Sequence, residues 1–133
     1  MKRSLEQKNR KNRGEVFTQP LLAEEMSNEI SEIEIDERIL YLSSGATNVL
    51  PIMMMFRYIK KFGKEHLSTY FNECIQICEV NRLAADFGQE ILMRYVLMLQ
   101  NTDVDIARQH YIDNYQIIIN EYYEFCELSE MGI

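Results

Sequence analysis

Two short apolar runs on either side of a methionine-rich segment constrain the fold of this chain most. The first, Ile39–Leu42, enters a small-residue turn that contains Gly45, and the second, Cys74–Cys78, stops at the carboxylate of Glu79. A strand, a turn, a helix and a second strand make a β-α-β unit, whose ligand sites lie at the carboxyl ends of its parallel strands. We therefore expect the two runs to pair in parallel and to form a pocket for an adenosine-type ligand.

The rest of the chain predicts further α/β structure. Apolar residues at four-residue spacing mark a helix over residues 82–100. Residues 105–111 predict a weak third strand, and Tyr115–Ile119, which ends in three isoleucines, predicts a strong fourth strand. The lack of polar alternation in Ile39–Leu42 is typical of a strand buried on both faces. The predicted fold is α/β: a truncated Rossmann-like domain over residues 14–133, with about four mostly parallel strands and helices on both faces.

The segment before the first strand predicts one more helix. Pro20 suits a first helical turn, where its missing N–H costs nothing. Leu22, Met26 and Ile30 then recur every fourth residue, with glutamates on the other side of the expected helix.

The charge is divided unevenly along the chain. Residues 1–13 carry six Lys/Arg and one Glu, whereas residues 14–133 carry eight Lys/Arg and 20 Asp/Glu. The first segment has almost no apolar side chains and predicts a disordered basic arm. This arm is either a solvated tail or a segment that contacts DNA phosphate or a partner, because the acidic body does not by itself attract nucleic acid.

Several classes of protein are disfavoured. No apolar run approaches the roughly 18–20 residues of a membrane span, and polar residues follow Met1 where a signal segment would be apolar. No metal-ligand spacing is visible. We expect a cytoplasmic protein, or one of a host cytoplasm or virion if it is viral, with no membrane contact and no metal site.

Four segments, taken in order, carry a resemblance to a known family. They are Gly-Glu-Val-Phe-Thr at residues 14–18, the turn with Gly45 and Asn48, the strand end Glu79-Val80-Asn81, and Asn120-Glu121-Tyr122-Tyr123. In order and spacing they resemble the S-adenosylmethionine-dependent DNA methyltransferases that modify the exocyclic amino group of adenine, of the restriction-modification and phage type. The resemblance covers roughly residues 12–123 and implies a methyltransferase-like domain.

The resemblance assigns five residues to cofactor binding. Phe17 and Thr18 would close over S-adenosylmethionine, and Gly45 would let the backbone approach it. Glu79 would accept hydrogen bonds from both ribose hydroxyls, and Asn48 belongs to the same cofactor loop.

The resemblance assigns two residues to catalysis. The chain also differs from the family at several motif positions. Asn120 would accept from the target amine and Tyr123 would stack on the flipped base, but the two prolines between them are replaced. In the cofactor loop the family's Asp, which handles the methionine ammonium, is Tyr41, and its second glycine is Thr47. The family has seven strands where we expect four. The cofactor that the resemblance implies is S-adenosylmethionine. Because these motif residues are replaced, we expect a vestigial site that no longer binds it.

Three functions are compatible with these patterns. The first is a catalytically degenerate, shortened relative of these enzymes. It would act as a binding or accessory module, for instance of a phage, by association with itself or a protein partner along an exposed fourth-strand edge. The alternative is the cofactor-binding subunit of a split adenine-specific methyltransferase, active only with a second chain. The third is a binder of nucleotide-type ligands without chemistry.

Overall fold

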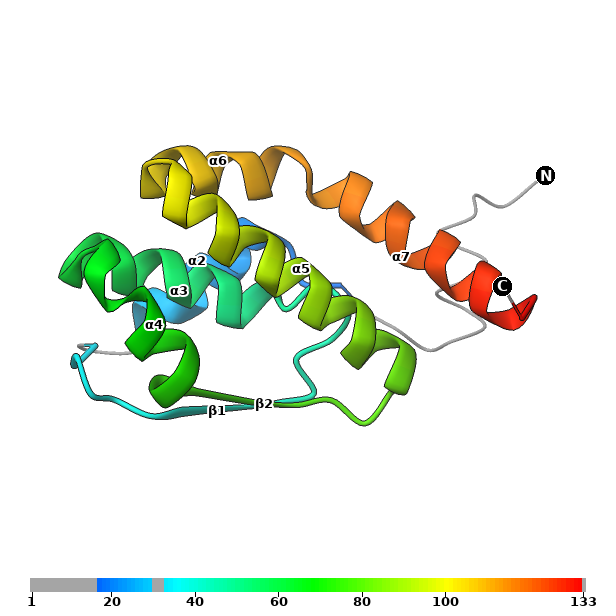
Figure 1. Ribbon diagram of the computed structural model, residues 1–133, viewed down its shortest axis with the longest axis horizontal. Coiled ribbons are helices and arrows are strands. Elements are labelled where there is room, and N and C mark those ends of the chain that lie inside the picture. The colour runs from blue at the N-terminus through cyan, green and yellow to red at the C-terminus, as the bar shows by residue number, and fades with distance from the viewer. Residues whose placement is uncertain (1–16, 30–32, 133) are drawn as a thin grey trace.

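The computed structural model describes residues 17–29 and 33–132, and this part of the chain is mostly helical (Figure 1). The element order is α2 (Pro20–Glu29), β1 (Ile39–Leu42), α3 (Val49–Phe62), η1 (Lys64–His66), α4 (Leu67–Thr69), η2 (Tyr70–Cys74), β2 (Ile75–Cys78), α5 (Arg82–Asn101), α6 (Val104–Asp113) and α7 (Tyr115–Glu130). The basic arm predicted at residues 1–13 lies outside the described residues. No helix within the described ranges is long and apolar enough to cross a membrane.

The predicted β-α-β unit is confirmed. β1 and β2 pair in parallel, with Ile39 opposite Ile75 and Leu42 opposite Cys78. The intervening α3 is apolar on nearly all sides, and nine of its residues are buried, as expected for a central helix. It ends at Gly63, whose φ of 101° lies in the region that favours glycine. The helix predicted over residues 82–100 is also confirmed as α5.

The predicted fold class, an α/β truncated Rossmann-like domain with about four strands, is wrong. The sheet formed by the described residues has two strands, and residues 105–111 and 115–119 lie in α6 and α7. The buried residues of α7 follow a spacing of three and four (Tyr115, Ile118, Ile119, Tyr122, Tyr123, Cys126). Packing of this helical face outweighs the β propensity of the isoleucines. The predicted association along a fourth-strand edge is therefore wrong as well, because residues 115–119 offer no strand edge.

The predicted coverage of the sheet by helices on both faces is also wrong. The labelled helices all lie on one side of β1 and β2 (Figure 1). Tyr41 is buried on that side, whereas Leu40 and Leu42 on the other side are 54% and 72% exposed. β1 is therefore buried on one face, and its lack of polar alternation reflects an exposed apolar face.

Aromatic side chains join the helices into one core. All eight tyrosines of the chain are buried. The ring of Tyr111 in α6 lies 6.1 Å from Phe56 in α3, 4.9 Å from Tyr95 in α5 and 5.6 Å from Tyr115 in α7, measured between centroids. These edge-to-face contacts add to the gain from apolar burial. They place the start of α7 beside the turn that precedes α3.

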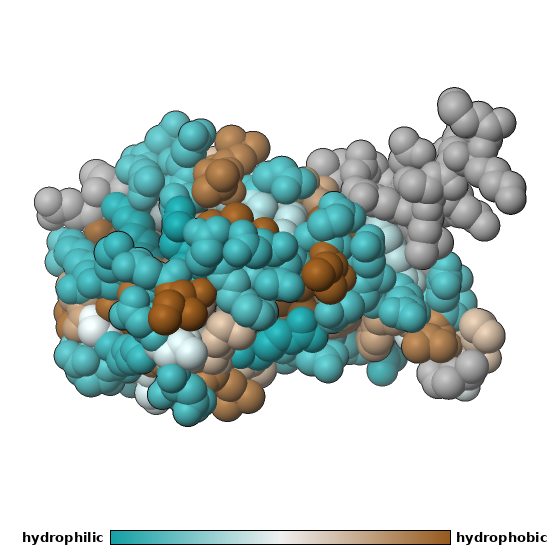
Figure 2. All heavy atoms as spheres, turned by 90° about the horizontal axis from the view of Figure 1, so that it is seen from above, coloured by the Kyte–Doolittle hydropathy of each residue, from teal (hydrophilic) through white to brown (hydrophobic). Residues whose placement is uncertain are grey.

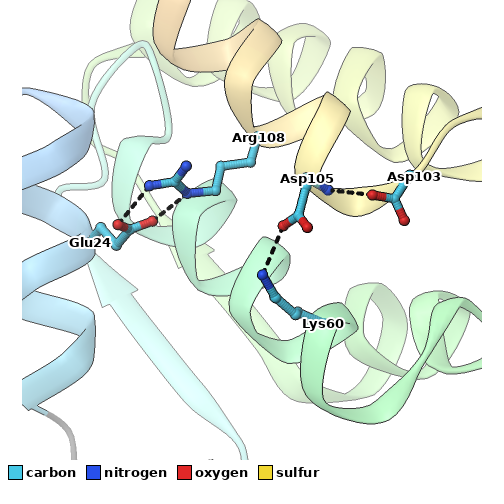
Figure 3. A network of polar contacts seen from close by, with 5 residues as sticks. All are labelled: Glu24, Lys60, Asp103, Asp105 and Arg108. Atoms are coloured by element: carbon cyan, nitrogen blue, oxygen red, sulfur yellow. Dashed lines mark hydrogen bonds and ion pairs between the residues drawn. The ribbon is translucent and has the colours of Figure 1, made fainter.

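Small buried residues and one ion pair hold α2 against this core. The buried residues of α2 are small ones: Pro20, Ala23 and Ser27. Leu22 and Met26, which form most of the apolar stripe seen in the sequence, are exposed. Glu24 accepts hydrogen bonds of 2.5 and 2.7 Å from the guanidinium of Arg108 in α6 (Figure 3). This bidentate ion pair fixes α2 where apolar burial is slight.

Candidate functional site

A pocket of about 290 Å³ opens at the carboxyl ends of β1 and β2. Its polar lining residues are Thr18, Ser43, Ser44, Thr47, Glu79 and Asn81. Its apolar lining residues are Phe17, Ala46, Val49, Leu50 and Ala84. Gly45 also lines the pocket. The structure thus brings together four of the five residues predicted to bind a cofactor: Phe17, Thr18, Gly45 and Glu79.

Glu79 joins the two strand ends. Its Oε1 accepts a hydrogen bond of 2.8 Å from the backbone N–H of Gly45, and its Oε2 accepts one of 2.9 Å from the N–H of Asn81. These two bonds fix the orientation of the carboxylate at the pocket wall. A carboxylate has about four acceptor sites, so each oxygen of Glu79 can still accept a hydrogen bond from a ligand hydroxyl.

The turn after β1 owes its shape to left-handed residues. Ser43, Gly45 and Asn48 have φ values of 55°, 78° and 48°. A Cβ at Gly45 would meet no atom within 4 Å, so glycine is favoured there for its backbone conformation rather than for space. The turn holds Ser44 at the pocket wall, and its buried Oγ has no hydrogen-bond partner among the residues that the structure describes.

Asn48, the fifth predicted cofactor residue, lies behind the turn. Its Nδ2 donates a 2.7 Å hydrogen bond to the carbonyl oxygen of Gly88 in α5. A Cβ at Gly88 would lie 2.9 Å from Asn48 Nδ2 and 3.2 Å from the carbonyl oxygen of Gly45. Asn48 therefore fastens the turn to α5, and the missing side chain at Gly88 permits that contact.

Two tyrosines of the segments predicted as strands form hydrogen bonds to residues that line the pocket. The hydroxyl of Tyr115 donates to the carbonyl oxygen of Thr18 at 2.6 Å and lies 3.0 Å from Thr47 Oγ1. The hydroxyl of Tyr111 donates to the carbonyl oxygen of Thr47 at 2.9 Å. Burial raises the pKa of Tyr115 to about 12, so its hydroxyl remains a donor. No motif indicated these roles, because they depend on where α6 and α7 pack.

The two residues predicted to be catalytic do not line the pocket. Asn120 is exposed on α7, where its Oδ1 accepts a 3.2 Å hydrogen bond from Gln116 Nε2. Tyr123 is fully buried, with its ring centroid 5.8 Å from that of Phe17. Tyr123 therefore packs against Phe17, and its buried ring has no exposed face on which a base could stack.

The charge of the pocket comes from Glu79, the one ionisable side chain among the described lining residues. Tyr41, which stands where the family has an Asp, is buried under the helices, and burial raises its pKa to about 12. The pocket therefore has no second carboxylate for the ammonium group of a methionine moiety. In the described part of the chain, no group of three or more His, Cys, Asp or Glu is placed to hold a metal ion.

Comparison of the chain with models of known protein families, with curated proteins and with solved structures gave no significant match. The resemblance to the adenine methyltransferases thus depends on the quoted residues and their order.

Proposed function

We propose that this protein is a catalytically degenerate relative of the adenine-specific DNA methyltransferases that acts by binding, and that its pocket takes a ribonucleoside of adenosine type. One observation carries the proposal. Four of the five residues that the resemblance assigns to the cofactor, Glu79 among them, line one pocket, whereas Asn120 and Tyr123 line none of it. This arrangement favours binding over methyl transfer, which needs its acceptor groups beside the bound methyl donor.

The pocket chemistry favours a nucleoside over S-adenosylmethionine. The free acceptor sites on both oxygens of Glu79 suit the two hydroxyls of a ribose, and Ser43 and Thr47 add further polar residues to the lining. Phe17, Val49 and Leu50 provide apolar surface for a base. S-adenosylmethionine adds an ammonium and a sulfonium, and with Tyr41 buried in place of an Asp these cations gain little from the site.

Calorimetric titration with adenosine, 2′-deoxyadenosine and S-adenosylmethionine tests the proposal. We expect adenosine to bind, and 2′-deoxyadenosine to bind about tenfold more weakly, because the loss of one hydrogen bond to a carboxylate costs about 1.5 kcal/mol or more. Glu79→Ala should weaken adenosine binding by at least about the same factor. Glu73→Ala, which removes an exposed carboxylate outside the pocket, is the matched control.

A second variant separates ligand contact from loop stability, because Glu79→Ala also leaves the N–H groups of Gly45 and Asn81 unpaired. Leu50→Trp adds bulk to the pocket from the first turn of α3 and leaves the carboxylate in place. We expect it to block adenosine. Unchanged binding by Leu50→Trp, or no binding of any of the three compounds by the folded wild-type protein, contradicts the proposal.

The second candidate is the cofactor-binding subunit of a split methyltransferase. It is favoured by the same separation, since a second chain would supply the groups that act on the base. In that case S-adenosylmethionine should bind, and methylation of adenine in DNA should need both chains. A methylation assay with the partner present, in which Glu79→Ala causes no loss, would remove this candidate.

We also propose what the protein binds and where it acts. A protein that acts by binding would meet a partner protein or a second copy in the cytoplasm, or in a host cytoplasm or virion if it is viral. Contact of residues 1–13 with DNA phosphate also remains a proposal, supported by their six Lys/Arg.

A further inference from the structure

The sheet presents an apolar face that no described helix covers. Leu40 and Leu42 of β1 are 54% and 72% exposed, whereas Tyr41 between them is buried. Because successive side chains of a strand point to opposite faces, the two leucines lie on the face opposite Tyr41. In the parallel register they lie opposite Gln76 and Cys78 of β2, which are also exposed. Val80, two residues further along, is 95% exposed. We call the surface made of Leu40, Leu42, Gln76 and Cys78, together with Val80 just beyond the end of β2, the open sheet face.

The open sheet face differs from the other exposed apolar residues. Parallel strands are normally covered on both faces by helices. Among the other exposed apolar residues, Leu97 on α5 and Ile106 on α6 stand singly, and Leu22 and Met26 lie one turn apart on α2. Exposed apolar residues on helices are ordinary for a soluble protein. Seen from the helical side, the surface is mainly hydrophilic, with separate apolar patches (Figure 2). A strand face that places apolar residues next to one another marks an interaction site.

A hollow and a group of carboxylates extend this face at its amino end. A cavity of about 340 Å³ is lined by Leu40 and Gln76 of the open sheet face together with Arg38, Asn72 and Glu73. Glu73, an exposed carboxylate, lines this cavity, and the exposed Asp36 lies three residues before β1 in sequence. Glu34 and Glu37 precede β1 as well. Arg38 is the one cation in this stretch of the described chain.

We propose that the open sheet face binds an amphipathic helix of a second protein, with aliphatic side chains on Leu40, Leu42 and Val80 and with lysines or arginines towards Glu73 and the acidic segment that precedes β1. A helix is the element that covers a parallel sheet. Charge complementarity favours basic flanks, because residues 14–133 carry 20 Asp/Glu and eight Lys/Arg.

A second copy of this chain fits the face less well. Each copy has a formal net charge of −7, so two copies repel one another. Face-to-face packing would also bring the same carboxylates together, with a handful of apolar side chains to oppose them. A stable dimer usually buries about 800 Å² on each partner, far more than three aliphatic side chains supply.

A designed peptide can act as the probe, because the natural partner is unidentified. The probe is a fluorescent leucine–lysine peptide of about five helical turns, compared by anisotropy with a leucine–glutamate peptide of the same length. The decisive variants are Leu40→Ser and its control Leu97→Ser, because both side chains are 54% exposed in the native protein. Leu42→Ser serves as a second variant of the face, and circular dichroism checks that each variant is folded.

We expect the lysine peptide to bind at least about tenfold more tightly than the glutamate peptide. Leu40→Ser and Leu42→Ser should each weaken it about tenfold, and Leu97→Ser should leave it unchanged. Equal effects of Leu40→Ser and Leu97→Ser, or a preference for the glutamate peptide, would overturn the proposal. Self-association in sedimentation that Leu40→Ser abolishes would also overturn it, by assigning the face to a second copy.

This inference rests on the proposed function only in that the protein acts by binding. The nucleoside titration uses the pocket variants Glu79→Ala and Leu50→Trp, whereas the peptide titration uses exposed residues outside the pocket. A failure of one titration therefore leaves the result of the other unaffected.

Discussion

Glu24 and Arg108 face each other between α2 and α6, and their ion pair has a consequence for pH. The hydrogen bond from Arg108 lowers the pKa of Glu24 below its ordinary value of 4.5. A carboxyl whose pKa is lowered by folding stabilises the protein when ionised. That contribution is complete above pH 4.5 and is lost as the pH falls through the lower folded-state pKa.

We predict that Glu24→Gln destabilises the protein by about 1–2 kcal/mol at neutral pH, and that wild type and variant converge as the pH falls below 4.5. Urea unfolding monitored between neutral and acidic pH measures both effects. Arg82→Gln is the control, because the 4.0 Å pair of Arg82 with Asp86 has both side chains exposed, and exposed pairs contribute little. A constant difference at every pH would contradict the assignment to ionisation.

Single residues could be predicted where their chemistry is distinctive. Gly45 and Glu79 were predicted to share a pocket because each follows one of two strands expected to pair in parallel, and the structure brings both into the pocket. Asn48 was placed in the right loop, but its direction towards Gly88 depends on how α5 packs. Tyr115 gave no signal, since its bonds to residues 18 and 47 span most of the chain.

Elements were predictable where local and packing preferences agree. The runs that form β1, α3, β2 and α5 satisfy both. In residues 115–119 the two disagree: the isoleucines favour a strand, but apolar residues at 115, 118, 119, 122 and 126 also give a helical period. The helical period extends over the whole of α7, and it prevails because it buries a long face against the core.

Alanine substitution distinguishes the two conformations of this segment. Ile118 is buried and Ile117 is exposed, so we predict that Ile118→Ala costs about 2–5 kcal/mol and Ile117→Ala about 0.5 kcal/mol or less. In a strand Ile117 and Ile119 would share a face. Similar large losses for Ile117→Ala and Ile119→Ala in chemical unfolding, with little loss for Ile118→Ala, would show a strand.

A further prediction concerns the contact between α5 and the turn that follows β1. Gly88→Ala would place a Cβ within 3.2 Å of the Gly45 carbonyl oxygen and 2.9 Å of Asn48 Nδ2. We expect a loss of about 1–3 kcal/mol from overpacking, although alanine is the better helix former. Gln89→Ala, at the exposed neighbouring position of α5, should be neutral in thermal unfolding. Equal midpoints for the two variants would show that the turn can move away without cost.

The whole molecule could be predicted only in part. The parallel pairing of β1 and β2 follows from their order and the helix between them. The number of strands could not be derived, because residues 104–130 become helical by packing on Phe56 and Tyr95, which are distant in sequence. The open sheet face has the same origin: with α6 and α7 on the helical side, no described element remains to cover Leu40 and Leu42.

A titration of the labelled protein with adenosine, followed by amide NMR, tests most directly whether the strand ends form a ribonucleoside site. We predict saturable shifts of the amide signals of Gly45 and Asn81, whose N–H groups donate to Glu79, and a much smaller response to 2′-deoxyadenosine. The amide of Asn120, on the exposed side of α7, should not respond. Unmoved signals at Gly45 and Asn81 in excess adenosine, or shifts centred on Asn120, would contradict it.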